Sequence, residues 1–243
     1  MRERAYREHY QAEDRHWWFR GRWAVVEALL ARTTLPPHPR ILDAGCGTGG
    51  NLQRYARLGE TSGVDPSPEA VRFCRERGFD SVQQAGLEQL PFADGSFDLI
   101  AATDVLEHVE AEQQALRELR RVTAPGAAML LTVPAYMWLW TAEDDRLHHK
   151  RRYTLGRLRR ATEEAGWRPV LSSYFNSALL PAIAATRQLT RNRDDDGQTD
   201  VERTPEWLNG PLLMPMRLEA RLIRAGARFP AGVSIGIVCR NLS

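Results

Sequence analysis

The segment ILDAGCGTGGN combines a short apolar run with closely spaced glycines. Gly45, Gly47 and Gly49 allow the backbone to turn tightly and to approach a ligand closely. The helix expected after them begins at a point that favours a negatively charged group. Asp43 ends the first expected strand, and Asp65 ends the next one, where an acid can accept hydrogen bonds from both ribose hydroxyls. The pattern therefore predicts a cofactor that contains a nucleoside.

Other nucleotide-binding patterns fit the sequence poorly. A dinucleotide fingerprint reads G-x-G-x-x-G, whereas the spacing here is D-x-G-x-G-x-G. A short-chain dehydrogenase would need a tyrosine four residues before a lysine, but the single lysine is Lys150 and residue 146 is an arginine. A P-loop would need G-K-[ST], which the sequence lacks.

Two histidines are candidates for acid–base chemistry. His108, in DVLEHV, could act as a general base that faces the reacting group. It could equally cap the helix that follows or bind a neighbouring carboxylate. His149 lies beside Arg151, Arg152 and Tyr153, and arginine side chains suit the recognition of phosphate or carboxylate. A structural ion-pair network with the acids at 143–145 is an equal alternative.

The segment HWWFRGRW concentrates three tryptophans in eight residues. It precedes the first expected strand and could fold across the end of the sheet as a lid. Because Trp17 and Trp18 are adjacent, we expect one to anchor on the domain while the other closes on the pocket. Arg20 could meet a cofactor carboxylate, and Trp23 could pack with the helix that follows. The alternative is that all three tryptophans belong to the core.

The elements that position these residues alternate along the chain. Strand and helix signals alternate from residue 40 to residue 133, which favours an α/β layer with a mostly parallel sheet. Around this core the sequence predicts further elements of one domain, 1–243. They are an N-terminal helical cap (1–37), a cofactor-binding core (38–175), a helical insertion (176–231) and a last strand (232–243).

Composition excludes several classes of protein. The formal net charge of +2 gives no strong field toward DNA or RNA. The three cysteines show no CxxC spacing, so we expect neither a disulfide framework nor a metal site, and a cytoplasmic location is the simple interpretation. The charged N-terminus does not resemble a signal peptide, and no apolar run is long enough to span a membrane.

The succession ILDAGCGTGGN, GVDPSPEAV, LPFADGSFDLI, DVLEHV and RVTAPGAAMLLTVP resembles the motifs of class I S-adenosylmethionine-dependent methyltransferases across residues 38–175. The resemblance implies a doubly wound, Rossmann-like sheet of seven strands with the last strand antiparallel. It implies S-adenosyl-L-methionine as cofactor and S-adenosyl-L-homocysteine as product. Where many relatives have an acid that meets the adenine amino group, this chain has Gly86.

Cofactor contacts carry over by motif. Gly45 and Gly47 would pass under the methionine portion, Asp65 would bind the ribose, and Thr103 would lie near the methionyl amino group. The full set of expected cofactor-binding residues is Trp18, Arg20, Asp43, Gly45, Cys46, Gly47, Gly49, Asp65, Thr103, and Pro66 and Leu87 on either side of the adenine.

The flanking segments resemble a narrower bacterial subgroup. HWWFRGR is one of its features, and VPAYMWLWTAEDDRLHHKRRYT after the fifth strand is the other. Glu143 stands where the subgroup has a histidine. From this stretch we expect His149 to join His108 in catalysis. The expected substrate-binding residues are Tyr136, Arg151, Arg152 and Tyr153.

The sequence thus predicts methyl transfer to a small-molecule acceptor, or to one linked to a lipid or sugar, with oxygen as first choice because EHV resembles the ubiquinone-type O-methyltransferases. The acceptor could be anionic. Arginines at 217, 221, 224 and 228 have helical spacing, so peripheral contact with the inner membrane face is a further hypothesis. The alternatives are a non-catalytic, cofactor-binding scaffold or regulatory subunit, and an RNA methyltransferase. The oligomeric state is open.

Overall fold

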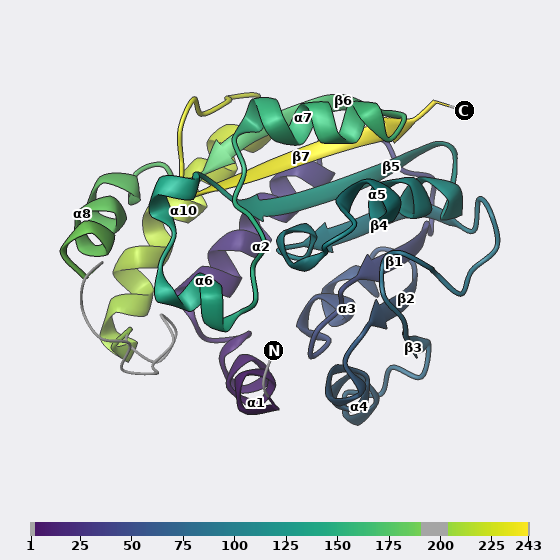
Figure 1. Cartoon of the computed structure of the whole chain (residues 1–243), viewed down its shortest axis with the longest axis horizontal. Helices are drawn as coiled ribbons and strands as arrows, with labels where there is room; N and C mark the ends of the chain where they lie inside the picture. The colour runs from purple at the N-terminus through teal and green to yellow at the C-terminus, as the bar shows by residue number, and fades with distance from the viewer. Residues whose placement is uncertain (1–2, 191–203, 243) are drawn as a thin grey trace.

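Seven strands form one mixed sheet in the computed structural model, which describes residues 3–190 and 204–242 (Figure 1). Across the sheet their order is β3-β2-β1-β4-β5-β7-β6. β7 pairs antiparallel with β5 and β6, and the other pairs are parallel. The expected Rossmann-like sheet with an antiparallel last strand is therefore confirmed. The strands are β1 (Arg40–Ala44), β2 (Glu60–Asp65), β3 (Val82–Gln84), β4 (Phe97–Thr103), β5 (Thr123–Pro134), β6 (Trp167–Phe175) and β7 (Ser234–Asn241).

The central strands are apolar on both faces because helices cover both. Successive side chains of a strand point to opposite faces, so Ile41 and Leu42 enter two different core clusters. Leu99 and Ile100 of β4 divide in the same way. This arrangement explains why the strand segments are nearly continuous apolar runs rather than alternating ones.

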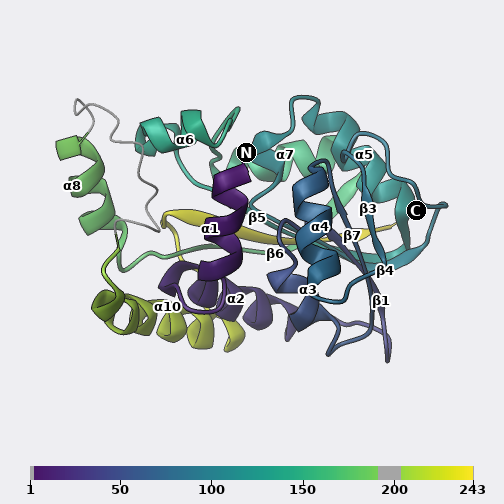
Figure 2. The same ribbon diagram turned by 90° about the horizontal axis from the view of Figure 1, so that it is seen from below.

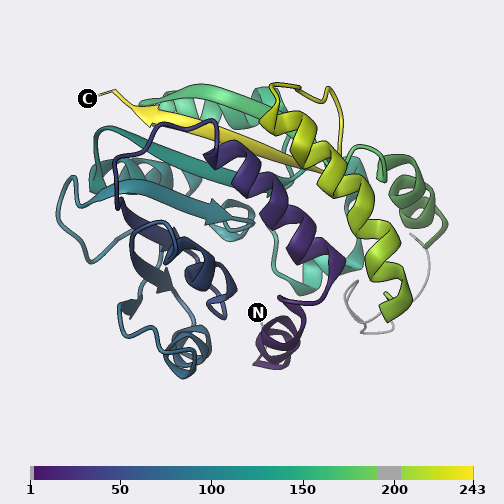
Figure 3. The same cartoon turned by 180° about the vertical axis from the view of Figure 1, so that it is seen from behind.

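Helices form a layer on each side of the sheet (Figures 2 and 3). α2 (Trp17–Leu30) and α10 (Asn209–Arg224) pack side by side on one face, where α3 (Gly50–Tyr55) adds Tyr55 to their cluster. α5 (Glu112–Val122) and α7 (Leu155–Glu164) cover the opposite face. Gly21 allows the close approach of α2 and α10, because a Cβ at this position would overlap the side chain of Met216.

Shorter elements surround the carboxyl ends of the strands. α1 (Glu3–Ala12) packs on α4 (Pro68–Glu76) through Tyr6 and Tyr10. The expected insertion contributes α10 to the core layer, and its residues 191–203 lie outside the described ranges. Within those ranges, no helix is long and apolar enough to cross a membrane. The remaining elements are η1 (Leu106–His108), η2 (Met137–Leu139), α6 (Ala142–Arg146), α8 (Leu180–Thr190) and η3 (Glu206–Leu208).

Candidate active site

A cavity of about 1260 Å³ opens at the carboxyl ends of the parallel strands. Pockets for one drug-sized ligand measure about 300–1,000 Å³, so this cavity has room for a cofactor and a second molecule. In a doubly wound fold this is the position expected for a ligand. The predicted site residues that line the cavity are Trp18, Gly45, Cys46, Gly47, Asp65, Pro66, Thr103, His108, His149 and Arg152.

The glycine-rich turn forms one wall of the cavity. Gly45, Gly47 and Gly49 all have positive φ angles of 82°, 53° and 85°, a conformation that favours glycine. A Cβ at Gly45 would overlap the side chain of Val105, whereas a Cβ at Gly47 would meet no atom within 4 Å. The turn therefore packs tightly on its protein side and leaves open space on its cavity side, as a cradle for a ligand requires.

Asp65 connects this turn to the end of β2. One carboxylate oxygen accepts a hydrogen bond from the Gly47 N–H at 3.0 Å, and the other accepts one from the Ser67 N–H at 2.9 Å. The Tyr6 hydroxyl of α1 donates to the same carboxylate at 3.4 Å. An ionised carboxylate has about four acceptor sites, so Asp65 retains capacity for a ribose hydroxyl. The chemistry of the turn and of Asp65 fits a nucleoside cofactor.

Asp43 lies behind the turn and is 1% exposed. Neither of its carboxylate oxygens has a hydrogen-bond partner among the described residues. Burial raises the pKa of Asp43 to about 7, although the nearby Arg22 guanidinium opposes this effect. Because Asp43 does not line the cavity, the expected direct contact with the cofactor is corrected to a position behind the loop.

The N-terminal helices close one side of the cavity. Trp17 and Trp18 both line it, and both also pack against the core cluster of α2 and α10. The expectation that one tryptophan anchors the segment on the domain while the other closes on the cavity is therefore wrong. Trp18 stacks on Phe175 with centroids 6.1 Å apart, and Trp23 packs edge-on against Tyr55 at 5.2 Å. The segment is at once part of the core and a wall of the cavity.

Arg20 is exposed and does not line the cavity, so it is not positioned for the expected contact with a cofactor there. Arg22 takes the inward position and donates to Asp104 at 2.6 Å. The reason is helical phase. His16 caps α2, with its Nδ1 accepting from the Trp18 N–H, and residues 20 and 22 then differ by about 200° around the axis.

Five further predicted residues lie outside the cavity lining, and the structure gives a local reason for each. Leu87 is buried in the core, and Tyr153 is fully buried with its hydroxyl 2.5 Å from Glu112. Gly49 forms the N-cap of α3. Tyr136 stacks on Trp138 and Tyr174, and Arg151 donates to the Glu110 carbonyl at 3.1 Å.

Arg152 lines the cavity but is bound to a carboxylate of the protein. Its Nε and one terminal nitrogen donate to the two oxygens of Asp144 at 2.8 and 2.9 Å, and both side chains are at least 95% buried. His149 Nδ1 lies 2.8 Å from the same carboxylate. These contacts hold the pKa of Asp144 below its usual range against the effect of burial. The alternative of an internal ion-pair network therefore applies to Arg152.

His108 and His149 both line the cavity and contact each other, with ring centroids 4.5 Å apart. Burial, and then the neighbouring His149, lower the pKa of His108 to about 4. The imidazole is therefore neutral near pH 7. His108 does not cap the helix that follows, because it ends the 3₁₀ turn η1 and α5 starts only at Glu112. Glu107, which precedes it, also lines the cavity.

Sequence reasoning missed several lining residues. Arg22 lies in HWWFRGRW and Glu107 in DVLEHV, but the spacing within these motifs does not indicate that either side chain faces the cavity. Asn51 donates to Thr103 at 3.0 Å from the first turn of α3, and Tyr6 reaches Asp65 from α1. Long-range contacts of this kind carry no local sequence signal. Only the glycine pattern before Asn51 could have pointed to it.

Comparisons with known proteins agree with this geometry. A family model described as a methyltransferase domain matches residues 42–131. Over 135 residues the chain is 32% identical to malonyl-[acyl-carrier protein] O-methyltransferase of Enterobacter lignolyticus (strain SCF1), covering 52% of this chain and 53% of the relative. It is 36% identical over 104 residues to norajmaline N-methyltransferase of Rauvolfia serpentina, covering 37% and 34%. The chain thus spans about half, or less, of the length of these relatives.

The fold also resembles solved structures. A crystal structure of an S-adenosylmethionine-dependent methyltransferase from Mesorhizobium loti superimposes with a TM-score of 0.59 at 18% identity, covering 89% of this chain and 97% of the other. At this identity the likeness concerns the fold. The family match identifies residues 42–131 as a methyltransferase domain, and the surrounding fold resembles that of S-adenosylmethionine-dependent methyltransferases.

Proposed function

We propose that the protein transfers the methyl group of S-adenosylmethionine to an oxygen atom of a small acceptor in the cavity. One observation carries the proposal. The glycine-rich turn and Asp65, at the ends of the adjacent strands β1 and β2, line the same cavity as Glu107 and His108, which follow β4, and as His149, which follows α6. A cofactor on the first group and an acceptor on the second would share one enclosed space.

The bound cofactor supplies a methyl group that is already activated as a sulfonium. The protein must then position the acceptor in line behind that methyl group and exclude water. Asp65 and the turn at Gly47 would hold the nucleoside end, and Trp17 and Trp18 would keep water from the reacting centre. Because His108 is neutral near pH 7, it can accept a hydrogen bond from an acceptor hydroxyl as this group approaches the methyl carbon.

The choice of oxygen rests on the residues around His108. A hydroxyl acceptor benefits from a group that takes its proton, whereas many amines react without one. The relatives include both O- and N-methyltransferases, so nitrogen is the competing acceptor. A cofactor-binding protein without transfer activity is the competing function.

A labelled methyl group tests both points. The purified protein is incubated with S-adenosylmethionine that carries a deuterated methyl group and with a bacterial metabolite extract, and products are found by mass spectrometry. We expect a product with the labelled methyl on oxygen, absent from a reaction with Asp65→Ala. Label on nitrogen would overturn the choice of acceptor atom. Binding of the cofactor with no labelled product from acceptor extracts of several bacteria would favour the non-catalytic function.

We also propose that the acceptor is anionic or lipid-linked. Arg146, Lys150 and Arg187 line the cavity and could meet an anionic group. On α10, the exposed apolar residues Leu218 and Leu222 lie beside exposed arginines at 217, 221 and 224, as expected of a helix that contacts lipid headgroups. The helix ends at Arg224, so Arg228 does not continue this face as expected. In a sedimentation assay at low salt, vesicles that contain anionic lipid should carry the protein into the pellet. Equal recovery with neutral vesicles would contradict this part of the proposal.

A further inference from the structure

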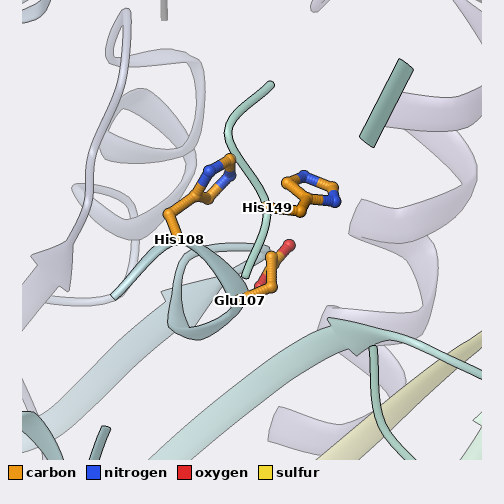
Figure 4. Close-up of side chains that lie close together, drawn as sticks. All are labelled: Glu107, His108 and His149. Atoms are coloured by element: carbon orange, nitrogen blue, oxygen red, sulfur yellow. The ribbon is translucent and has the colours of Figure 1, made fainter. Parts of the chain in front are cut away.

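Glu107, His108 and His149 point toward one another beside the cavity (Figure 4). One possible ligand atom of each residue lies within 4.8 Å of those of the other two. The first two residues belong to the 3₁₀ turn after β4, and His149 follows α6. The Lys150 N–H donates to the Glu107 carbonyl at 2.7 Å, so a backbone hydrogen bond joins the two segments.

Both imidazoles are oriented through one nitrogen. His149 Nδ1 lies 2.8 Å from Asp144, which Arg152 in turn fixes through two hydrogen bonds. A hydrogen bond to the Leu147 carbonyl orients His108. Histidines that bind a metal usually donate the other ring N–H to a carboxylate or a backbone carbonyl, which fixes the tautomer and leaves one nitrogen for the ion. Both histidines here have such a partner.

Glu107 supplies the third donor, a carboxylate oxygen. Its side chain is buried, and one carboxylate oxygen has no hydrogen bond from any residue in the described ranges. An unsatisfied buried carboxylate is costly, and the neighbouring Asp104, although paired with Arg22, disfavours the charge of Glu107 further. A bound cation would offset the cost of burying this carboxylate.

We propose that Glu107, His108 and His149 bind a divalent first-row transition-metal ion such as Zn²⁺. Two imidazoles and one carboxylate, with a further position open toward a cavity, are the donor set of catalytic zinc sites and of related iron sites. Ligand atoms at about 2.1 Å from one ion lie about 3–4 Å apart, so the three side chains must close by an ångström or so when the ion binds. The open position would accept an oxygen atom of a bound small molecule.

This proposal differs from the expectation in the sequence analysis that the chain has no metal site. That expectation rested on the spacing of the cysteines, whereas the proposed ligands are the adjacent residues Glu107 and His108 and a histidine from a separate segment. Metal binding does not depend on methyl transfer, but both proposals use the same His108 nitrogen, so a bound ion would take the place of the hydrogen bond proposed for the acceptor hydroxyl. Failure of metal binding would leave the proposed function intact, and failure of the proposed function would leave the metal site intact.

The test uses the full chain, freed of metal with a chelator and titrated with Zn²⁺ by calorimetry. We expect one Zn²⁺ per chain, and a visible absorption band when Co²⁺ replaces it. Glu107→Gln and His149→Ala should each weaken binding more than about 100-fold, and Asp144→Asn about 10–100-fold. His38→Ala, which alters an exposed histidine outside the cluster, is the control and should bind as the wild type does.

Circular dichroism shows which variants are folded. The proposal is overturned if folded wild-type protein binds no Zn²⁺. It is also overturned if Glu107→Gln and His149→Ala bind as tightly as His38→Ala. If one of these two variants does not fold, His108→Gln takes its place with the same expected loss.

Discussion

Replacement of Asp43 by asparagine should change how the stability of the protein depends on pH. Burial raises the pKa of this carboxyl from 3.8 to about 7, and neither oxygen has a hydrogen-bond partner within the described residues. The unfolded chain keeps the ordinary value, so it releases the proton at a lower pH than the folded protein does. Between about pH 4 and pH 7, rising pH therefore favours the unfolded state.

The magnitude follows from the pKa difference. About three pKa units, at about 1.4 kcal/mol each, correspond to about 4 kcal/mol of lost stability above pH 7. Somewhat more than 1 kcal/mol of this loss is already present at pH 5, so about 2–3 kcal/mol should be lost between pH 5 and pH 8. The asparagine side chain of the variant carries no charge and avoids the loss, whereas other titrating groups affect both proteins alike.

Urea unfolding of the wild type and of Asp43→Asn at pH 5 and pH 8 measures this effect. Relative to the wild type, the variant should gain about 2–3 kcal/mol of unfolding free energy at the higher pH. Asp80→Asn alters an exposed carboxylate and serves as the control, with no comparable gain. A difference in unfolding free energy between wild type and Asp43→Asn that is the same at both pH values would show that Asp43 does not titrate with a raised pKa.

Three further changes test other parts of the site. Removal of residues 1–12 should leave α2 and the sheet folded but weaken S-adenosylhomocysteine binding about tenfold in calorimetry, because one or more contacts near the cofactor are lost; unchanged affinity would remove α1 from the site. Arg22→Met should cost about 3–5 kcal/mol in urea unfolding, since it leaves the Asp104 carboxylate unpaired; a cost below about 1 kcal/mol would show that this ion pair matters little. Gly45→Ala should lower the free energy of unfolding by about 1–3 kcal/mol, because Gly45 has a positive φ and an added Cβ would overlap Val105. Adding Val105→Ala to this variant should recover part of the loss. Equal stability of the wild type, the single variant and the double variant would disprove the tight packing.

The sheet and the glycine-rich turn were predictable because their signals are local. The alternation expected from residue 40 to residue 133 corresponds to β1 to β5, and the last strand expected within residues 232–243 is β7, since buried strands are short apolar runs between turn signals. Gly45 and Gly47 stand out for the same reason, because backbone geometry restricts the residue type. The acid at the end of β2 follows from the topology of the fold.

The direction of individual side chains was less predictable. Arg20 and Arg22 are two residues apart in one motif, and only the start of α2 decides which of them faces inward. The sequence suggests that Tyr153 binds substrate, but an isolated β-bridge to Ala135 places it in the core. The sequence places Glu107 beside His108, but it does not bring His149 to them. Such pairs depend on how the loop around α6 packs, which no local pattern records.

Titration of the purified protein with S-adenosylhomocysteine measures whether the glycine-rich turn and Asp65 bind the cofactor. We expect saturable binding of one molecule per chain in calorimetry. We also expect Asp65→Ala to weaken this binding by about 1.5–3 kcal/mol, as expected for lost hydrogen bonds to a charged group. A folded wild-type protein that binds neither S-adenosylhomocysteine nor S-adenosylmethionine would show that the cavity is not a cofactor site.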